Sequence, residues 1–282
     1  MDDDTPEMLA LELVKQGGRL LAASPEARTL VATGGFTILN HHAAQIDVRR
    51  SVTDPAFDAS VNVVGLLNLL EGAREGGVRR VVFASSGGTV YGEGAQLPLA
   101  EPMAKLPASP YGAAKLASEY YLATASQLHG FEAVALRYSN VYGPRQNPHG
   151  EAGVVAIFSL KIRMGEPLLI FGDGEQTRDM VFVEDVAAAN LAAAAVPLAP
   201  LTDLDARAFN IGTGVETTVN RLAELLAAGA GRPVDIRHAP ARAGELRRSV
   251  LSIDKARRAL GWTPRTALAD GLRITYRSLT ED

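Results

Sequence analysis

Tyr111 and Lys115 are the two residues whose types and spacing most directly suggest chemistry in this sequence. We predict a helix from Pro110 to about Leu128, and residues four apart on a helix share one face. Ser109, just before it, is a preferred N-cap, and proline fits a first helical turn. A phenol normally keeps its proton to a pH of about 10, and a neighbouring ammonium favours the phenolate. The pair could therefore supply a general base.

Small polar residues follow two of the predicted strands. Ser85 and Ser86 come directly after a strand at Arg80–Ala84, where parallel sheets place groups that contact ligands. One of these hydroxyls could hydrogen-bond a substrate oxygen while the tyrosine moves a proton. The segment Ser-Ser-Gly-Gly also has the composition of an ordinary turn, and both interpretations stay open. Asn140 follows the next strand and can donate to and accept from a sugar or a diphosphate.

Two later segments combine arginines with carboxylates. The glycine-rich segment from Phe171 ends at Arg178, whose guanidinium could hold a phosphate through two hydrogen bonds. Arg242 and Glu245 form a second cation and carboxylate three positions apart. Taken singly, each segment also fits a solvated loop or a surface ion pair that contributes little.

The order of the predicted elements indicates an α/β protein with a parallel sheet. A strand at Phe36–Asn40, a helix at Asp54–Glu75, the strand at Arg80–Ala84, the helix from Pro110 and a strand at Ala133–Arg137 alternate. Less regular elements follow, namely helices at Val154–Met164, Val183–Ala195, Val219–Ala228 and Leu268–Leu279 and strands at Leu168–Ile170, Ala208–Ile211 and Val234–Arg237. Before the strand at Phe36–Asn40, we predict an amphipathic helix at Pro6–Lys15 and then an irregular stretch to Gly35.

Composition narrows the class of protein. The 282 residues have a net charge of −4, which argues against binding to nucleic acid or to an anionic membrane. The sequence contains no cysteine, which excludes disulfides and thiolate chemistry. His41 and His42 have no acidic or cysteine partner at metal-ligand spacing, so we expect no metal. No signal peptide or membrane-spanning run is recognisable, so we expect a cytoplasmic protein. Trp262 is expected to be a buried anchor.

Taken together, the motifs resemble those of the extended short-chain dehydrogenase/reductases, specifically the NAD-dependent epimerase/dehydratase family and within it the UDP-glucose 4-epimerases. The resemblance covers about residues 36–282. The matching segments, in the family's order, are His42–Gln45, Asn62–Gly65, Phe83–Gly92, Ser109–Lys115, Leu136–Arg145, Gly172–Asp179, Asn210–Gly214, Arg242–Glu245 and Leu260–Pro264.

The resemblance implies NAD-dependent epimerisation of a nucleotide-activated hexose through a transient 4-keto sugar. Tyr111 would take the proton of the sugar 4-hydroxyl, Lys115 would bind the nicotinamide ribose and lower the pKa of the tyrosine, and Ser86 or Ser85 would bridge substrate and tyrosine. The implied cofactor-binding residues are Ala43, Ala44, Gln45, Asn62, Ser85, Tyr111, Lys115 and Tyr138. The implied substrate-binding residues are Asn140, Gly153, Val154, Phe171, Arg178, Arg242 and Glu245. The helices at 54–75 and 110–128 would form a homodimer interface.

The sequence departs from the family at its start. The family begins with a strand, a glycine turn and a helix that bring backbone amides to the pyrophosphate. Val31–Phe36 resembles that turn only partly, because a third glycine and a following helix are missing. We therefore expect a Rossmann-like parallel sheet that lacks its first β-α-β unit, through a miscalled start, an upstream frameshift or a deletion, with a smaller C-terminal substrate domain. The strand at Phe36–Asn40 would then have an uncovered edge, unless residues 1–35 lie over it.

This departure also defines the expected domains and the alternatives. Residues 1–35 would be an unmatched segment, residues 36–150 with about 180–212 the remaining NAD-binding part, and residues 151–179 with 213–282 the nucleotide-sugar-binding domain. One alternative is a non-catalytic remnant that binds a nucleotide sugar or a partner subunit. The other is a nucleotide-sugar 4,6-dehydratase, which ranks lower because Gly87 and Gly88 stand where such enzymes carry an acidic pair.

Overall fold

The computed structural model describes residues 22–93, 96–149, 153–231, 233–241 and 246–279, together with the backbone of 8–10. The strands are β1 (Met8–Ala10), β2 (Ile38–His41), β3 (Arg80–Ser86), β4 (Glu132–Tyr138), β5 (Asn140–Tyr142), β6 (Leu168–Phe171), β7 (Thr177–Phe182), β8 (Ala208–Ile211), β9 (Glu216–Thr218) and β10 (Ile236–Ala239). The helices are α1 (Pro25–Thr33), α2 (Val48–Thr53), α3 (Pro55–Ala59), the π-helix η1 (Ser60–Val64), α4 (Gly65–Glu75), α5 (Pro110–His129), α6 (Val154–Met164), α7 (Val183–Ala195), α8 (Val219–Ala230), α9 (Asp254–Leu260) and α10 (Leu268–Ser278).

The chain divides into two compact units. Unit 1 comprises residues up to 93, 101–137 and 190–209, and unit 2 comprises 94–100, 138–189 and 210–282. These units are defined by compactness alone, and the domain limits expected from the sequence stay a prediction.

A five-stranded sheet in the order β1-β2-β3-β4-β8 forms the centre of unit 1. β2 pairs in parallel with β3, Ile38 opposite Arg80, and β1 pairs in parallel with β2, Met8 opposite Ile38. The expected α/β class with a Rossmann-like parallel sheet is therefore confirmed. All four residues of β2 are buried, as are the first six of β3, which fits strands covered on both faces.

The predictions for the segment before Phe36 were wrong. Met8–Ala10 is a strand rather than part of a helix. It pairs with the edge of β2, so of the two alternatives for this edge the one in which part of residues 1–35 covers it holds. The rest of the predicted helix lies outside the described residues. The expected irregular stretch contains α1 instead, because Ser24 caps it through the Ala27 amide at 3.3 Å and Pro25 occupies the first turn.

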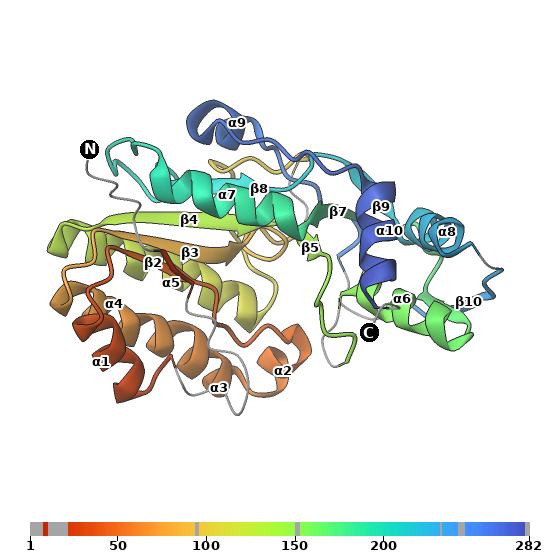
Figure 1. Cartoon of the computed structure of the whole chain (residues 1–282), viewed down its shortest axis with the longest axis horizontal. Coiled ribbons are helices and arrows are strands. Elements are labelled where there is room, and N and C mark those ends of the chain that lie inside the picture. The colour runs from red at the N-terminus through yellow and green to blue at the C-terminus, as the bar shows by residue number, and fades with distance from the viewer. Residues whose placement is uncertain are drawn as a thin grey trace. The chain divides into compact units, whose positions relative to one another are not determined.

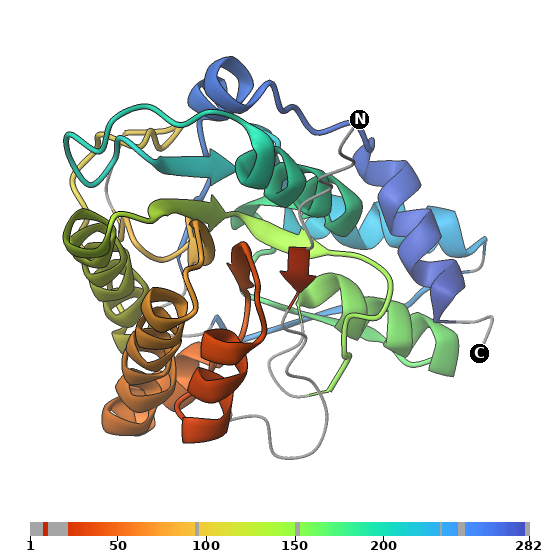
Figure 2. The ribbon, with the colours of Figure 1, turned by 60° about the vertical axis from the view of Figure 1, so that its left-hand side comes forward.

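Helices α1, α4 and α5 lie side by side against one face of this sheet (Figures 1 and 2). Val31 of α1, Leu69 of α4 and Leu122 of α5 belong to one buried cluster with Leu39 of β2 and Phe83 of β3. Gly72 lets α4 approach α1 closely, since an added Cβ would lie 2.7 Å from the Arg28 carbonyl oxygen. Packing of apolar side chains between helix and sheet thus fixes the position of α5, which carries Tyr111 and Lys115.

The helix predicted at Asp54–Glu75 is interrupted. It consists of α3, the π-helix η1 and α4, and α2 precedes it. Asn62, at the centre of η1, accepts a hydrogen bond on its backbone oxygen from Ser118 of α5 at 3.2 Å. Single π-turns are rare in proteins, and a large share of them lie at functional sites. The π-turn therefore makes Asn62 a candidate functional residue.

Unit 2 contains two small sheets, β10-β6 and β5-β7-β9, and the helices α6, α8 and α10. Their apolar faces share a core that includes Phe158, Ile170, Leu222 and Leu272. The predicted anchor Trp262 is confirmed, since it is 4% exposed and donates from Nε1 to the Asp185 carbonyl at 2.8 Å. The sequence did not predict β5, β7, β9 and α9, most of which are too short to show a periodicity.

Candidate functional site

The first turn of α5 and the end of β3 bring four of the predicted catalytic residues together in unit 1. Ser109 caps α5 by accepting the Gly112 amide at 3.2 Å, as the sequence predicted. Tyr111 and Lys115 then lie one turn apart on the helix. The Lys115 Nζ donates to the carbonyl of Ala84 in β3 at 2.8 Å and lies 5.8 Å from the centre of the Tyr111 ring.

The two serines at the end of β3 have different partners. Ser86 is half-buried and its side chain hydrogen-bonds Tyr111. Ser85 is buried and donates to Glu119 at 2.5 Å. Successive side chains of a strand point to opposite faces, which accounts for the difference. Geometry thus associates Ser86, and not Ser85, with the tyrosine hydroxyl.

Glu119 belongs to a buried ion-pair network that the sequence reasoning missed. Arg137 of β4 is 0% exposed and binds Glu119 through two nitrogens at 2.6 and 3.0 Å. Its guanidinium also donates to Asp205 at 2.8 Å and to the Tyr91 hydroxyl at 3.0 Å. An arginine in an otherwise apolar strand and an acid one turn after Lys115 were the available signals. The network fixes β3, β4 and α5 relative to one another.

The charge state of Tyr111 corrects one expectation. We expected Lys115 to lower its pKa, but burial raises the pKa of Tyr111 to about 12, with a smaller opposing effect of the Ser86 hydrogen bond and a further increase from Asp58. Lys115 donates to the Ala84 carbonyl, and this hydrogen bond does not stabilise the phenolate. The protein groups around the tyrosine therefore keep it protonated at neutral pH.

Lys115 is itself perturbed. It is 3% exposed, and its Nζ lies 4.8 Å from the centre of the Phe83 ring. Burial lowers the pKa of Lys115 to about 8, while Asp58 and Glu119 oppose the shift. The same burial and the Lys115 charge lower the pKa of His41 to about 3, so that histidine is neutral. Strongly perturbed groups at the carboxyl end of a sheet are typical of functional sites.

The loop after β2 is held by a second polar network. Asn62 accepts the Gln45 amide at 2.9 Å and donates to the Gln45 carbonyl at 3.0 Å, so one side chain binds both backbone groups. Gln45 and Asn62 also donate to Asp58 at 2.9 and 3.0 Å. Gln45 and Asn62, predicted to bind the cofactor, are 8% and 3% exposed. Their side chains position the loop that carries Ala43 and Ala44.

The residues of unit 1 fit part of an NAD molecule. Ala43 and Ala44 are small and half-buried after β2, and a buried lysine and a phenol lie at the end of the neighbouring strand. Small side chains and a cation at the carboxyl ends of parallel strands suit a nicotinamide riboside. Tyr138, the remaining predicted cofactor residue, is half-buried and belongs to unit 2.

Five of the predicted substrate residues are described, all in unit 2. Asn140 is exposed in β5, Gly153 precedes the first residue Val154 of α6, and Phe171 ends β6. Arg178 in β7 donates from Nη1 to the carbonyls of Thr177 and Leu246 at 2.7 and 2.8 Å. Arg242 and Glu245 lie outside the described residues.

Asp179, beside Arg178, is a second structural carboxylate that sequence reasoning missed. It is 0% exposed and accepts from the amide and hydroxyl of Thr213, both at 2.7 Å, from the Gly214 amide at 3.1 Å and from the Leu251 amide at 3.2 Å. A buried carboxylate with several amide donors fixes the turn after β8 and the strand-like segment at 251. It thereby supports β7, which carries Arg178.

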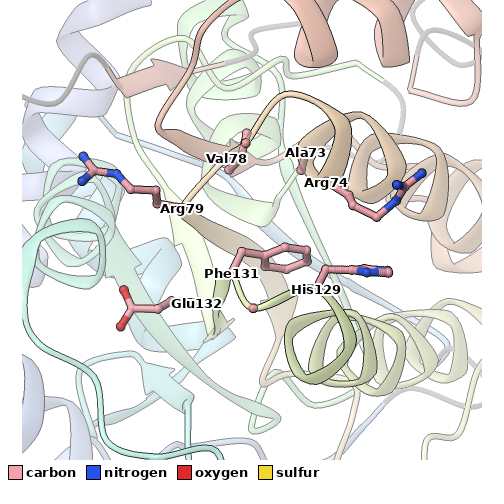
Figure 3. A pocket seen from close by; sticks show the side chains of 9 residues that line it. Ala73, Arg74, Val78, Arg79, His129, Phe131 and Glu132 are labelled. Atoms are coloured by element: carbon pink, nitrogen blue, oxygen red, sulfur yellow. The ribbon is translucent and has the colours of Figure 1, made fainter.

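A shallow hollow of about 430 Å³ on unit 1 lies away from this site (Figure 3). Phe131 lies at its centre, His129 and Arg74 point outward on one side, and Arg79 points outward on the other. It opens at the amino ends of β3 and β4, whereas Ser86 ends β3. His129 is also about 27 Å along α5 from Tyr111. The hollow thus lies at the amino ends of the strands, opposite to the carboxyl ends that carry the candidate site.

Among the described residues, no three or more His, Cys, Asp or Glu side chains are grouped so as to hold a metal ion. In the same part of the chain, no helix combines the length and apolar character needed to cross a bilayer.

Comparison with known proteins gives the family. Residues 18–212 match the model of the NAD dependent epimerase/dehydratase family. The UDP-glucose 4-epimerase of Mycolicibacterium smegmatis is 49% identical over 238 residues, which are 84% of this chain and 74% of the relative. This chain therefore belongs to the NAD-dependent epimerase/dehydratase family.

Solved structures agree with this assignment. The UDP-glucose 4-epimerase of Thermotoga maritima with UDP-glucose is 41% identical, with a TM-score of 0.87 over 93% of this chain and 82% of the other. The Thermus thermophilus UDP-glucose 4-epimerase in complex with NAD is 41% identical, with a TM-score of 0.81 over 92% and 83% of the two chains.

Proposed function

We propose that this protein is a nucleotide-sugar 4-epimerase that interconverts UDP-glucose and UDP-galactose through a transient 4-keto sugar. The observation that carries the proposal is the group formed by Tyr111, Ser86 and Lys115 at the carboxyl end of β3. Similar proteins of the same family are named UDP-glucose 4-epimerase, and the structure of one of them contains UDP-glucose.

In the proposed reaction Tyr111 acts as the proton carrier. Its phenolate oxygen takes the proton of the sugar 4-hydroxyl as hydride leaves C4, which gives the 4-keto sugar. The sugar then presents its other face, and the phenol returns the proton to O4 as hydride returns to C4. When bound, NAD would accept and return that hydride, and its nicotinamide carries a positive charge that favours the phenolate.

Ser86 and Lys115 have supporting roles in this proposal. The Ser86 hydroxyl bonds the Tyr111 side chain, and so can bridge the tyrosine and the sugar 4-oxygen. Lys115 would hold the nicotinamide ribose together with the small residues Ala43 and Ala44. Ser85, which donates to Glu119, would act only by fixing the end of β3.

In unit 2 the proposed role is recognition of the nucleotide and the diphosphate. Gly153 and Val154 present the amino end of the 11-residue helix α6, where free amides favour anions. Arg178 is partly exposed and is held by two backbone carbonyls, which would fix its guanidinium for a phosphate. Asn140 and Phe171 would also contact the nucleotide and the diphosphate.

We also propose a homodimer through α5 and the helices at 54–75. Val64, Tyr120 and Tyr121 on these helices are 52%, 57% and 47% exposed and would give the proposed interface apolar surface to bury. A Tyr121→Lys variant should sediment as a monomer while the parent sediments as a dimer. The cytoplasmic location expected from the sequence stays a prediction.

The test of the function uses the purified chain. Bound NAD is measured by absorbance and fluorescence, and interconversion of UDP-glucose and UDP-galactose is measured with and without added NAD. Bound cofactor and turnover are expected. A folded protein with neither would favour a non-catalytic remnant instead.

A further inference from the structure

Asp58 is a buried carboxylate on a helix that packs against α5, which carries the candidate catalytic pair, and no motif of the family resemblance includes it. It lies in α3 and is 0% exposed. One oxygen, Oδ1, accepts from Gln45 at 2.9 Å and from Asn62 at 3.0 Å. The other, Oδ2, is buried and accepts no hydrogen bond from any residue that the structure describes. Half of this carboxylate therefore has no polar contact to compensate its burial.

The Asp58 charge acts on Lys115. Helices α3 and η1 pack against α5, and Asn62, one turn after Asp58, contacts Ser118, one turn after Lys115. Burial raises the pKa of Asp58, and the hydrogen bonds from Gln45 and Asn62 and, more weakly, the attraction to Lys115 oppose the rise. The same attraction raises the pKa of Lys115.

The other charged groups that face Lys115 do not replace Asp58. Glu119 of α5 also attracts the ammonium, but its carboxylate already accepts two nitrogens of Arg137 and the hydroxyl of Ser85. His41 is neutral, and burial lowers the pKa of His42. Among the described groups, Asp58 is thus the carboxylate near Lys115 whose charge no arginine compensates.

We propose that Asp58 is a positioning residue for the epimerase reaction, which holds the loop after β2 through Gln45 and keeps the Lys115 side chain a cation. Burial alone drives the buried lysine toward the neutral amine, and with Asp58 the pKa of Lys115 is about 8. A neutral residue at 58 would remove this attraction, so the lysine would lose its proton at a lower pH. The role of the Lys115 cation in the reaction rests on the proposed function. The charge of Lys115 does not, because it can be measured without turnover.

The test is a titration of Lys115 in the folded full chain by lysine 13Cε NMR, with the signal assigned by its loss in Lys115→Met. In Asp58→Asn, whose amide oxygen can still accept from Gln45 and Asn62, the Lys115 midpoint should fall by about one pH unit or more. Asp54→Asn is the matched control, because Asp54 is exposed and caps α3 from its side chain at 3.1 Å. That control should leave the midpoint in place. An unchanged midpoint in Asp58→Asn would overturn the proposal.

A reciprocal measurement covers the case in which Asp58→Asn does not fold. In Lys115→Met, the carboxyl 13C signal of Asp58 should titrate at a higher pH than in the parent, since its counter-charge is gone. No shift, or an Asp58 carboxyl already protonated at pH 7 in the parent, would contradict the inference.

Turnover separates this inference from the proposed function. If the chain epimerises, the alkaline decline of kcat/KM should move to lower pH in Asp58→Asn, whereas a purely structural role would lower stability without moving the profile. If the NMR shift is present but the folded parent has no turnover, the function fails and the charge assignment stands.

Discussion

Replacing Gly112 by alanine should weaken both the fold and the catalytic group, although alanine is the better helix former. Gly112 lies in the first turn of α5, directly after Tyr111. A Cβ at this position would lie 2.8 Å from the backbone oxygen of Thr89, 3.1 Å from Pro107 Cβ and 3.2 Å from Thr89 Cβ. The nearest atom belongs to backbone, so the contact cannot be relieved by rotating a side chain.

The magnitude follows from two opposing effects. The gain in helix propensity from glycine to alanine is about 1 kcal/mol at most. Overpacking against a backbone atom costs about 1–3 kcal/mol. With the full propensity gain, the net loss in the free energy of unfolding is up to about 2 kcal/mol. Thr89 and Val90 donate their amides to the Ser86 carbonyl at 3.3 and 3.1 Å, so a displaced Thr89 also moves Ser86 away from Tyr111.

The assay combines denaturant unfolding with the epimerase rate. A loss of about 1.4 kcal/mol in the transition state would appear as a tenfold lower kcat. Gly229→Ala is the control, because Gly229 is in α8 and its nearest contacts to an added Cβ are 3.9 Å away. The control should be slightly more stable than the parent. A Gly112→Ala protein with parental stability and kcat would refute the packing argument.

Two further predictions concern buried charge. Glu119→Ala should lower the free energy of unfolding by about 3 kcal/mol, because it removes one of the two carboxylates that bind the buried Arg137 and leaves only Asp205 of the pair. Glu119→Leu with Arg137→Met should recover most of the loss, and equal losses in denaturant melts of the single and double variants would contradict this. His41 is buried and neutral, and its pKa is about 3 against a usual value of 6.5. Between these two pH values the unfolded chain binds more protons than the folded chain. The free energy of unfolding should therefore fall as the pH drops below about 6.5. The slope from this one group is at most about 1.4 kcal/mol per pH unit, and His41→Leu should remove it; an identical pH dependence in His41→Leu would show that other groups cause the acid loss.

Local patterns in the sequence predicted the elements that carry the site. Ser109 caps α5 as expected, and α6 and α7 begin and end where their periodicity predicted. The segment before Phe36 was predicted wrongly, because three residues of strand pairing with a distant edge leave no local pattern. The segment Ser24-Pro25-Glu26 is the local sequence signal for the capped helix α1.

The polar networks could not be predicted in the same way. Arg137 and Glu119 are 18 residues apart, and Gln45 and Asn62 are 17 apart, so their pairing depends on the packing of β4, α5 and η1. The choice between Ser85 and Ser86 depends on which face of β3 each side chain points to. The raised pKa of Tyr111 depends on burial, which no spacing of tyrosine and lysine reveals.

The most direct test of the central claim is the rate of UDP-glucose and UDP-galactose interconversion by the parent and by Tyr111→Phe, each with added NAD. Removing a proton-transfer group costs about 10²–10⁴-fold, so the phenylalanine protein should keep its melting temperature and lose at least about 100-fold in kcat. A Tyr111→Phe protein that retains the parental rate, or a folded parent with no interconversion, would contradict the assignment of Tyr111 as the proton carrier of an epimerase.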